Sequence, residues 1–192
     1  MSGTTKKRII VGISGASGII YGIRALEQLK QLGIETHLVM SRAAEMTLAY
    51  ETDIKPKEIR EMADVFHPVG DIGASISSGS FHTLGMLIAP CSIRTMSEIA
   101  TGITGSLLSR AADVVLKERR RLVLGIRETP LHTGHLRTMT QLSEMGAVIC
   151  PVVPAFYNRP KTLDDIVNHS VGRMLDLFDI DTGMVRRWKS EE

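Results

Sequence analysis

Apolar positions in this chain follow two alternating spacings. Residues 8–14 form a short, mostly β-branched apolar run that ends in a glycine turn, which predicts a buried strand. In the next segment apolar residues recur every three or four positions from Ile19 to Leu29, and Gly33 follows, which predicts a helix that ends at a glycine. The chain therefore begins with a strand, a glycine-rich turn and a helix.

The same alternation continues along the rest of the chain. Further strands are predicted at 35–40, 65–67, 84–89, 122–126 and 147–153. Further helices are predicted at 42–51, 56–63, 93–100, 106–119, 135–144 and 163–178. Residues 71–81 are rich in Gly and Ser and are expected to form a mobile loop. Strands that alternate with helices predict a parallel sheet with helices on both faces, whose ligand lies at the carboxyl ends of the strands.

Size and composition narrow the class of protein. With 192 residues, 43% of them hydrophobic, the chain is expected to form one domain, 1–192, with a flexible N terminus (1–7) and a C-terminal segment (179–192). The 23 Lys and Arg residues nearly balance the 21 Asp and Glu residues, so neither nucleic acid nor a membrane is an expected partner. The first apolar run is interrupted by Gly and Ser and does not predict a membrane span. Two cysteines, Cys91 and Cys150, suit a reducing cytoplasm.

The first candidate motif is the glycine turn at Gly12–Gly18, between a predicted strand and a predicted helix. Glycines let the backbone approach a ligand closely, and the amides of the following helix favour an anion. The spacing is GxxGxxG, which differs from the GxGxxG dinucleotide fingerprint, and the second strand ends at Ser41 rather than at an acidic residue. Ser41 could donate a hydrogen bond to a phosphate. A tight turn that only caps a helix remains the alternative.

The second motif, Pro90–Thr95, follows the clearest predicted central strand. Ser92 and Thr95 can cap the next helix, and their hydroxyls, the first-turn amides and Arg94 could also hold a phosphate. Cys91 is expected to be a buried small residue rather than a nucleophile, because no adjacent histidine could activate it.

Charged residues form a third group. Arg127 and Glu128 follow a predicted strand and could clamp an anion beside a proton acceptor, or could form an ordinary surface ion pair. Arg110 and Lys117 lie two helical turns apart, about 10 Å, on one stripe of a helix. Asp113 is four residues before Lys117, so a local ion pair is the simpler explanation of that lysine.

No metal site is expected from the sequence. His132 and His135 are three residues apart but lack a further ligand cluster, and the pair Asp164–Asp165 fits the amino-terminal end of a helix. The histidines at positions 37, 82 and 169 show no constellation. Tyr157, after a proline-rich segment, is by default an amphipathic surface residue.

Taken together, these segments resemble the UbiX-type flavin prenyltransferases, a family related to proteins once called phenylacrylic acid decarboxylases. The resemblance extends from about residue 8 to residue 188. It is carried, in this order, by Gly15–Gly18, Glu51–Asp53, Pro90–Ser92, Arg110–Asp113, Lys117–Arg120, Arg127–Pro130, Pro154–Tyr157 and Arg187–Trp188.

The resemblance implies an α/β, flavodoxin-like or Rossmann-like three-layer fold with a mostly parallel sheet, assembled as a homododecamer with FMN between subunits. It implies transfer of a dimethylallyl group from dimethylallyl monophosphate to N5 and C6 of reduced FMN, without a metal. The prenylated FMN would serve a UbiD-type decarboxylase, as in ubiquinone biosynthesis.

The resemblance also implies roles for individual residues. FMN would be held by Gly15, Ala16, Ser17, Ser41, Ser92, Ile93, Arg94, Thr95 and Arg127, with Ser17 close to flavin N5. The prenyl phosphate would be contacted by Arg110, Lys117, Glu128, Tyr157 and Arg173. Glu51 would transfer protons, and Trp188 would cover the prenyl chain. The catalytic group would be Ser17, Glu51, Lys117 and Glu128.

Three alternatives stay open at this point. An FMN-dependent cysteine decarboxylase shares the fold but uses a catalytic histidine and an Asn-containing PASANT segment; the corresponding segment here, Pro90–Thr95, has no Asn, and His67 is more simply structural. A direct aromatic-acid decarboxylase would need an electron sink beyond the flavin. In a non-catalytic FMN-binding protein the cationic residues would serve only assembly.

Overall fold

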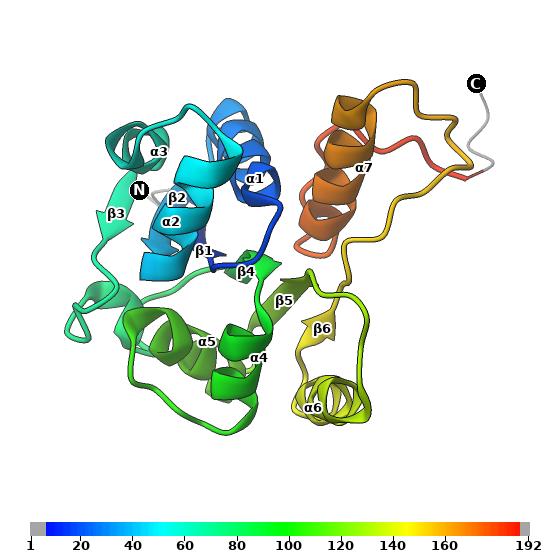
Figure 1. Cartoon of the computed structure of the whole chain (residues 1–192). Helices are drawn as coiled ribbons and strands as arrows, with labels where there is room; N and C mark the ends of the chain where they lie inside the picture. The colour runs from blue at the N-terminus through cyan, green and yellow to red at the C-terminus, as the bar shows by residue number, and fades with distance from the viewer. Residues whose placement is uncertain (1–6, 189–192) are drawn as a thin grey trace.

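The fold is built from six strands and seven α-helices within residues 7–188, the part of the chain that the computed structural model describes (Figure 1). The strands are β1 (Arg8–Ile13), β2 (Glu35–Met40), β3 (Val65–His67), β4 (Gly85–Cys91), β5 (Arg121–Ile126) and β6 (Val148–Ile149). The helices are α1 (Ile19–Gln31), α2 (Arg42–Glu51), α3 (Pro56–Met62), α4 (Ile93–Ala100), α5 (Leu107–Lys117), α6 (Thr133–Glu144) and α7 (Leu163–Asp176), with a 3-10 helix η1 (Ser75–Ser77). The expected flexible N terminus lies, apart from Lys7, outside the described residues.

The strands form one sheet in the order β3-β2-β1-β4-β5-β6, and each of the described strand pairs is parallel. This confirms the expected α/β class. The expectation was a mostly parallel sheet, and the described strand pairs are all parallel. The full order is that of a Rossmann sheet, and without the three-residue edge strand β3 it becomes the flavodoxin order. In both descriptions the order reverses between β1 and β4, so a crevice for a ligand is expected at the carboxyl ends of these two strands.

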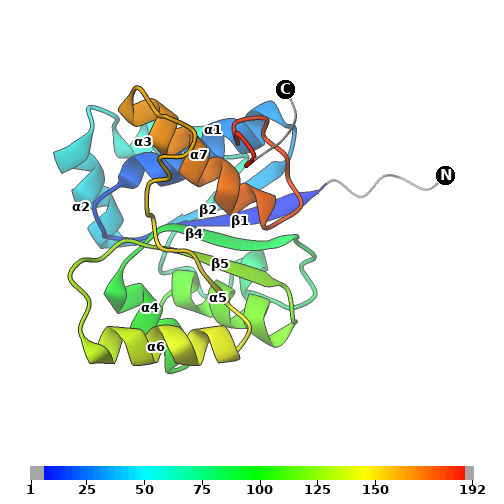
Figure 2. The same ribbon diagram turned by 90° about the vertical axis from the view of Figure 1, so that its right-hand side faces the viewer.

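Helices cover both faces of the sheet, as Figure 2 shows. One face packs under α1, α3 and α7 in a cluster that includes Val11, Leu26 and Val171, each with no exposed surface. The other face packs against α4, α5 and α6 in a second cluster that includes Ile88 and Leu108. Successive residues of β1 point into opposite clusters, which explains why its sequence is apolar at almost every position.

Most elements begin and end within two residues of the predicted positions, and three differences concern β6, β4 and the loop at residues 71–81. Strand β6 covers only Val148–Ile149 instead of 147–153. The amides of Cys150 and Val152 still donate to the carbonyls of Leu124 and Ile126, but Pro154, the next residue in phase, has no amide to continue the pairing. Strand β4 extends to Cys91 rather than ending at residue 89. The expected loop at 71–81 contains η1, whose Ile76 is buried in the second cluster.

Within residues 7–188, no helix has the length and apolar character needed to cross a membrane.

Candidate active site

The ends of β1 and β4 are joined by a buried serine. Ser14 has no exposed surface; its hydroxyl donates to the carbonyl of Pro90 at 3.0 Å and accepts from the amide of Ser92 at 2.7 Å. A hydroxyl that both donates and accepts satisfies two backbone groups at a point where the ladder ends. Ser14 thereby holds the glycine turn after β1 beside the start of α4.

The glycine turn passes very close to α2. A Cβ atom built on Gly15 would lie 2.3 Å from the Cβ of Ala43, which only the absence of a side chain avoids. Gly18, at the start of α1, has a φ of 98°, a conformation that favours glycine. The absence of a side chain on Gly15 therefore lets the turn pack directly against α2, at a position that lines the cleft described below.

Glu51, the last residue of α2, caps the start of α1. Its carboxylate accepts hydrogen bonds from the amides of Gly18 at 2.9 Å and Ile19 at 2.9 Å. Burial favours the neutral acid, but hydrogen bonds from Ser17, Ile19 and Gly18 and the charge of Arg127 outweigh it, so the pKa of Glu51 is lowered. Glu51 is therefore an ionised carboxylate at neutral pH, held by the backbone amides at the start of α1.

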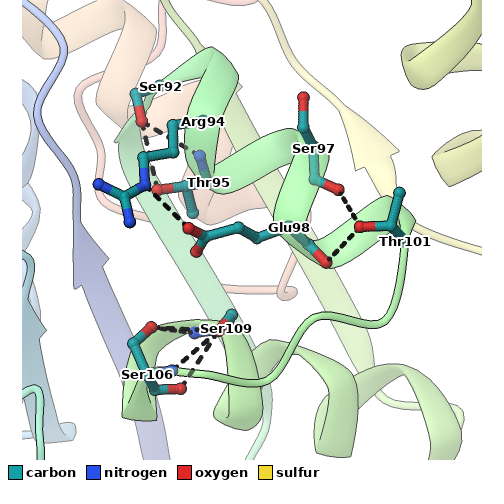
Figure 3. A network of polar contacts seen from close by, with 8 residues as sticks. All are labelled: Ser92, Arg94, Thr95, Ser97, Glu98, Thr101, Ser106 and Ser109. Atoms are coloured by element: carbon teal, nitrogen blue, oxygen red, sulfur yellow. Dashed lines mark hydrogen bonds and ion pairs between the residues drawn. The ribbon is translucent and has the colours of Figure 1, made fainter.

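A cleft of about 480 Å³ opens at the carboxyl ends of these strands. It is lined by Gly15, Ser41, Arg42, Ala43, Val69, Gly70, Ser92, Arg94, Thr95, Glu98, Ile103, Gly105, Ser106 and Leu108. All three lining serines are helix caps: the hydroxyls of Ser41, Ser92 and Ser106 accept from the amides of Ala44, Thr95 and Ser109 at the starts of α2, α4 and α5. Figure 3 shows the polar networks at the starts of α4 and α5.

Three helix N termini around one cleft favour an anion, because each brings backbone amides and the positive end of a helix dipole. In its cap each serine uses its oxygen as an acceptor; the hydroxyl hydrogens of Ser41 and Ser92 can turn to a ligand, although that of Ser92 faces Thr95 at 3.2 Å here. Arg94 also faces the cleft, paired with Glu98 at 2.9 Å. The donor set suits the phosphate of FMN.

The third sequence motif begins at the same sheet edge. The amide of Arg127 donates to the carbonyl of Cys91 at 3.2 Å, which continues the β4–β5 pairing, and the charge of Arg127 acts on Glu51 and on Tyr21. Glu128 is exposed and accepts from the amide of Thr129 at 3.0 Å. Cys91 has no exposed surface and burial raises the pKa of its thiol, in line with an inert core residue.

Tyr157, Arg173 and Trp188 gather in a second group, near α7 rather than in the cleft. The Tyr157 ring meets the Trp188 ring edge-on at 5.4 Å between centroids, and its hydroxyl is 2.9 Å from Nε2 of His169. Arg173, one turn along α7 from His169, donates to Asp176 at 2.7 Å. The C-terminal segment is thus tied to α7 by aromatic and polar contacts.

Helix α5 carries the remaining predicted cations, and the expected pair of Lys117 with Asp113 is wrong. Asp113 accepts from Arg110 at 3.0 Å, one turn earlier, while Lys117 contacts Glu118 at 2.9 Å, just past the last helical residue. The 11 residues of α5 span about 16 Å from the cleft, where Ser106 lies, to the opposite edge of the sheet. Within one subunit the structure therefore does not bring Lys117 to the cleft.

Two histidines that show no constellation in the sequence have partners in the structure. Nδ1 of His37 lies 2.9 Å from Nε2 of His67, and His37 also contacts Glu35, so His67 is part of a buried structural pair. His169 pairs with Tyr157. The ring centroids of His132 and His135 lie 3.6 Å apart with their planes tilted by 32°, and no group of three or more metal-ligating side chains occurs in the described part of the chain.

Sequence reasoning also missed Ser14, Glu98 and Ser106. Ser14 could have been found from the sequence, because it directly follows the apolar run of the first strand. A hydroxyl buried at that position needs hydrogen-bond partners nearby. Nothing local marks Glu98 or Ser106, because they face the cleft only after α4 and α5 are packed side by side.

Comparison with known proteins agrees with this geometry. The family described as Flavoprotein matches residues 2–180. The chain is 64% identical over 175 residues to "Flavin prenyltransferase UbiX" of Escherichia coli (strain K12), covering 91% of this chain and 93% of that protein.

Two solved structures share the fold at high similarity. "AnUbiX (PadA1) in complex with FMN and dimethylallyl pyrophosphate" has a TM-score of 0.95 and 51% identity, covering 98% of this chain and 100% of that one. A "dodecameric FMN-dependent Ubix-like Decarboxylase from Escherichia coli O157:H7" has a TM-score of 0.93 and 47% identity, covering 95% and 100%. With a glycine turn and three capped helix N termini at the sheet's switch point, the chain belongs to the flavoprotein family, among the flavin prenyltransferases of the UbiX type.

Proposed function

We propose that this chain transfers a dimethylallyl group from a dimethylallyl phosphate to N5 and C6 of reduced FMN. The observation that carries the proposal is the cleft at β1 and β4, whose donor set suits a flavin phosphate, in a chain 51% identical to a protein solved with FMN and dimethylallyl pyrophosphate. Reduced FMN, when bound, supplies the nucleophilic nitrogen and carbon. The protein has to hold the reactants, favour departure of the phosphate and exclude water.

FMN binding is assigned to the residues around the cleft. Ser41, Ser92, Thr95 and Arg94 would hold the phosphate together with the first-turn amides of their helices. The flavin ring would lie along the backbone of Gly15–Ser17, where the turn leaves no room for a side chain on Gly15. Arg127 would complete this side of the site. Ile93, at the start of α4, would contribute backbone.

Departure of the phosphate requires positive charge, and this is the role proposed for Lys117, Arg110 and Arg173. A phosphate that leaves an allylic carbon gathers negative charge, which preplaced cations stabilise without a metal ion. Glu128 is assigned to the same phosphate site. Tyr157 would contact the phosphate, and Trp188 would cover the apolar prenyl chain so that water is excluded.

Such a site is complete only if subunits share it. Lys117 lies at the far end of α5 from the cleft of its own subunit, so a neighbouring subunit would have to supply it. A dodecameric relative of 47% identity supports a homododecamer for this chain. We further propose that a UbiD-type decarboxylase receives the product, and that the enzyme works in the cytoplasm, where the free thiols Cys91 and Cys150 remain reduced.

The test is to mix the purified protein with reduced FMN and either dimethylallyl monophosphate or the diphosphate, without oxygen. A prenyltransferase yields a flavin of higher mass together with free phosphate or pyrophosphate, measured by mass spectrometry and a phosphate assay. FMN that binds but keeps its mass with both donors would refute the proposal in favour of a binding protein. Release of carbon dioxide from cysteine or an aromatic acid by this protein alone would instead support a decarboxylase.

A further inference from the structure

The segment that carries Tyr157 is held by few contacts of its own. It connects β6 to α7 without regular secondary structure, as Figure 1 shows, and the tyrosine is 44% exposed. Two ring contacts and one hydrogen bond locate the side chain: Trp188 at 5.4 Å, His169 at 5.5 Å, and Nε2 of His169 at 2.9 Å from the hydroxyl. His169 is the single hydrogen-bond partner of this hydroxyl among the described residues.

His169, in contrast, is firmly placed. It is 6% exposed, lies in the middle of α7, and shares a face of that helix with Arg173 and Asp176. Asp176 accepts hydrogen bonds from Arg173 at 2.7 Å and from Arg187 at 3.2 Å. A rigid helix thus fixes, side by side, a hydrogen-bond partner for a loop-borne tyrosine and one of the cations assigned to the prenyl phosphate.

We propose that His169 is a positioning residue that orients the Tyr157 hydroxyl toward the phosphate of the prenyl donor. The inference rests on the proposed function and adds a residue to it. A phosphate accepts a hydrogen bond but does not donate one when ionised, so Tyr157 must donate to it. Nε2 of His169 then has to carry a hydrogen and donate to the tyrosine oxygen, which leaves the tyrosine hydrogen for the phosphate.

The surroundings of His169 agree with this role. Burial and the nearby charge of Arg173 lower the pKa of His169, and Asp176 opposes them more weakly, so the ring is neutral at pH 7. A neutral ring adds no charge to the site and can adopt the Nε2–H form. Three other groups face this region: Tyr157, the thiol of Cys150, which lines a cavity of about 90 Å³ together with His169, and Arg187, which pairs with Asp176 and is close enough to Tyr157 to interact with it electrostatically.

The experiment is a double-mutant cycle with His169→Leu, Tyr157→Phe and both changes together, measured as KM for the dimethylallyl phosphate and kcat with reduced FMN. If the histidine acts through the tyrosine hydroxyl, His169→Leu raises KM about tenfold in the wild-type background and leaves it unchanged in Tyr157→Phe. An equal rise in both backgrounds would overturn the proposal, because it would show a purely structural effect.

Two further variants complete the design. His169→Gln keeps a side-chain donor and is expected to restore KM to within about threefold of wild type; a variant as impaired as His169→Leu would also overturn the proposal. Ser170 lines the same cavity as His169, and Ser170→Ala is the control that should leave KM unchanged. Melting temperature and FMN affinity verify that each variant is folded. Should the wild-type protein fail to prenylate FMN, the proposed function itself would fail, which is a distinct result.

Discussion

The carboxylate of Glu51 accepts a hydrogen bond of 2.9 Å from the backbone amide of Gly18, a residue 33 positions earlier in the sequence. The contact joins the end of α2 to the start of α1 and satisfies an amide that has no partner inside its own helix. It also places a negative charge at the positive end of the α1 dipole, beside the turn proposed to meet the flavin. One side chain therefore serves helix capping, turn geometry and site electrostatics together.

We predict that Glu51→Gln lowers stability by about 1 kcal/mol at pH 7, the usual loss for a helix cap. The pKa of Glu51 in the folded protein lies below its ordinary value of 4.5, so its contribution is complete above pH 4.5 and is lost as pH falls below that value. The difference in the free energy of unfolding between wild type and variant, measured by urea unfolding, should be smaller at pH 3 than at pH 7. A difference that stays constant would contradict the assignment. Glu61→Gln, in an exposed pair with Lys57, is the matched control with little effect.

We predict that Gly15→Ala destabilises the protein by about 1–3 kcal/mol and weakens FMN binding, because its Cβ would overlap that of Ala43. Removing the opposing methyl group in a Gly15→Ala, Ala43→Gly double variant should recover part of the affinity. Ala43→Gly alone measures the helix-propensity loss, about 1 kcal/mol. Flavin fluorescence titration gives the affinities. Tight FMN binding by Gly15→Ala would show that the turn does not approach the flavin.

We predict that two inactive variants restore each other's activity when they share an oligomer. Lys117→Ala should bind FMN but lose turnover, and Glu51→Gln should also lose turnover. If Lys117 acts on a neighbouring subunit's cleft, co-expression of the two in equal amounts leaves about a quarter of the sites intact in mixed oligomers. Mixed oligomers carrying two different tags are isolated and assayed. If mixed oligomers that contain both variant subunits have no activity, Lys117 acts in the cleft of its own subunit.

Much of the fold could be predicted because its signals are local. The apolar run of β1 and the helical spacing of α1 are each visible within a dozen residues, and alternation of such units leads to a parallel sheet. The exceptions have physical causes: pairing of the last strand with β5 stops at Pro154, which has no amide, and Ile76 draws a loop rich in Gly and Ser onto the core. Ion pairs were less predictable, since Asp113 had two cations within reach on the same helix and pairs with Arg110.

The sequence by itself determined which segments turn, that Ser92 can cap the helix after the central strand, and which family motifs are present, because these depend on neighbours a few residues away. Only the tertiary structure decided that Glu51 meets Gly18, that His169 holds Tyr157, and that Lys117 lies away from the cleft of its own subunit. Those contacts join distant parts of the chain, and they arise only when helices on both faces bury their apolar sides against one sheet.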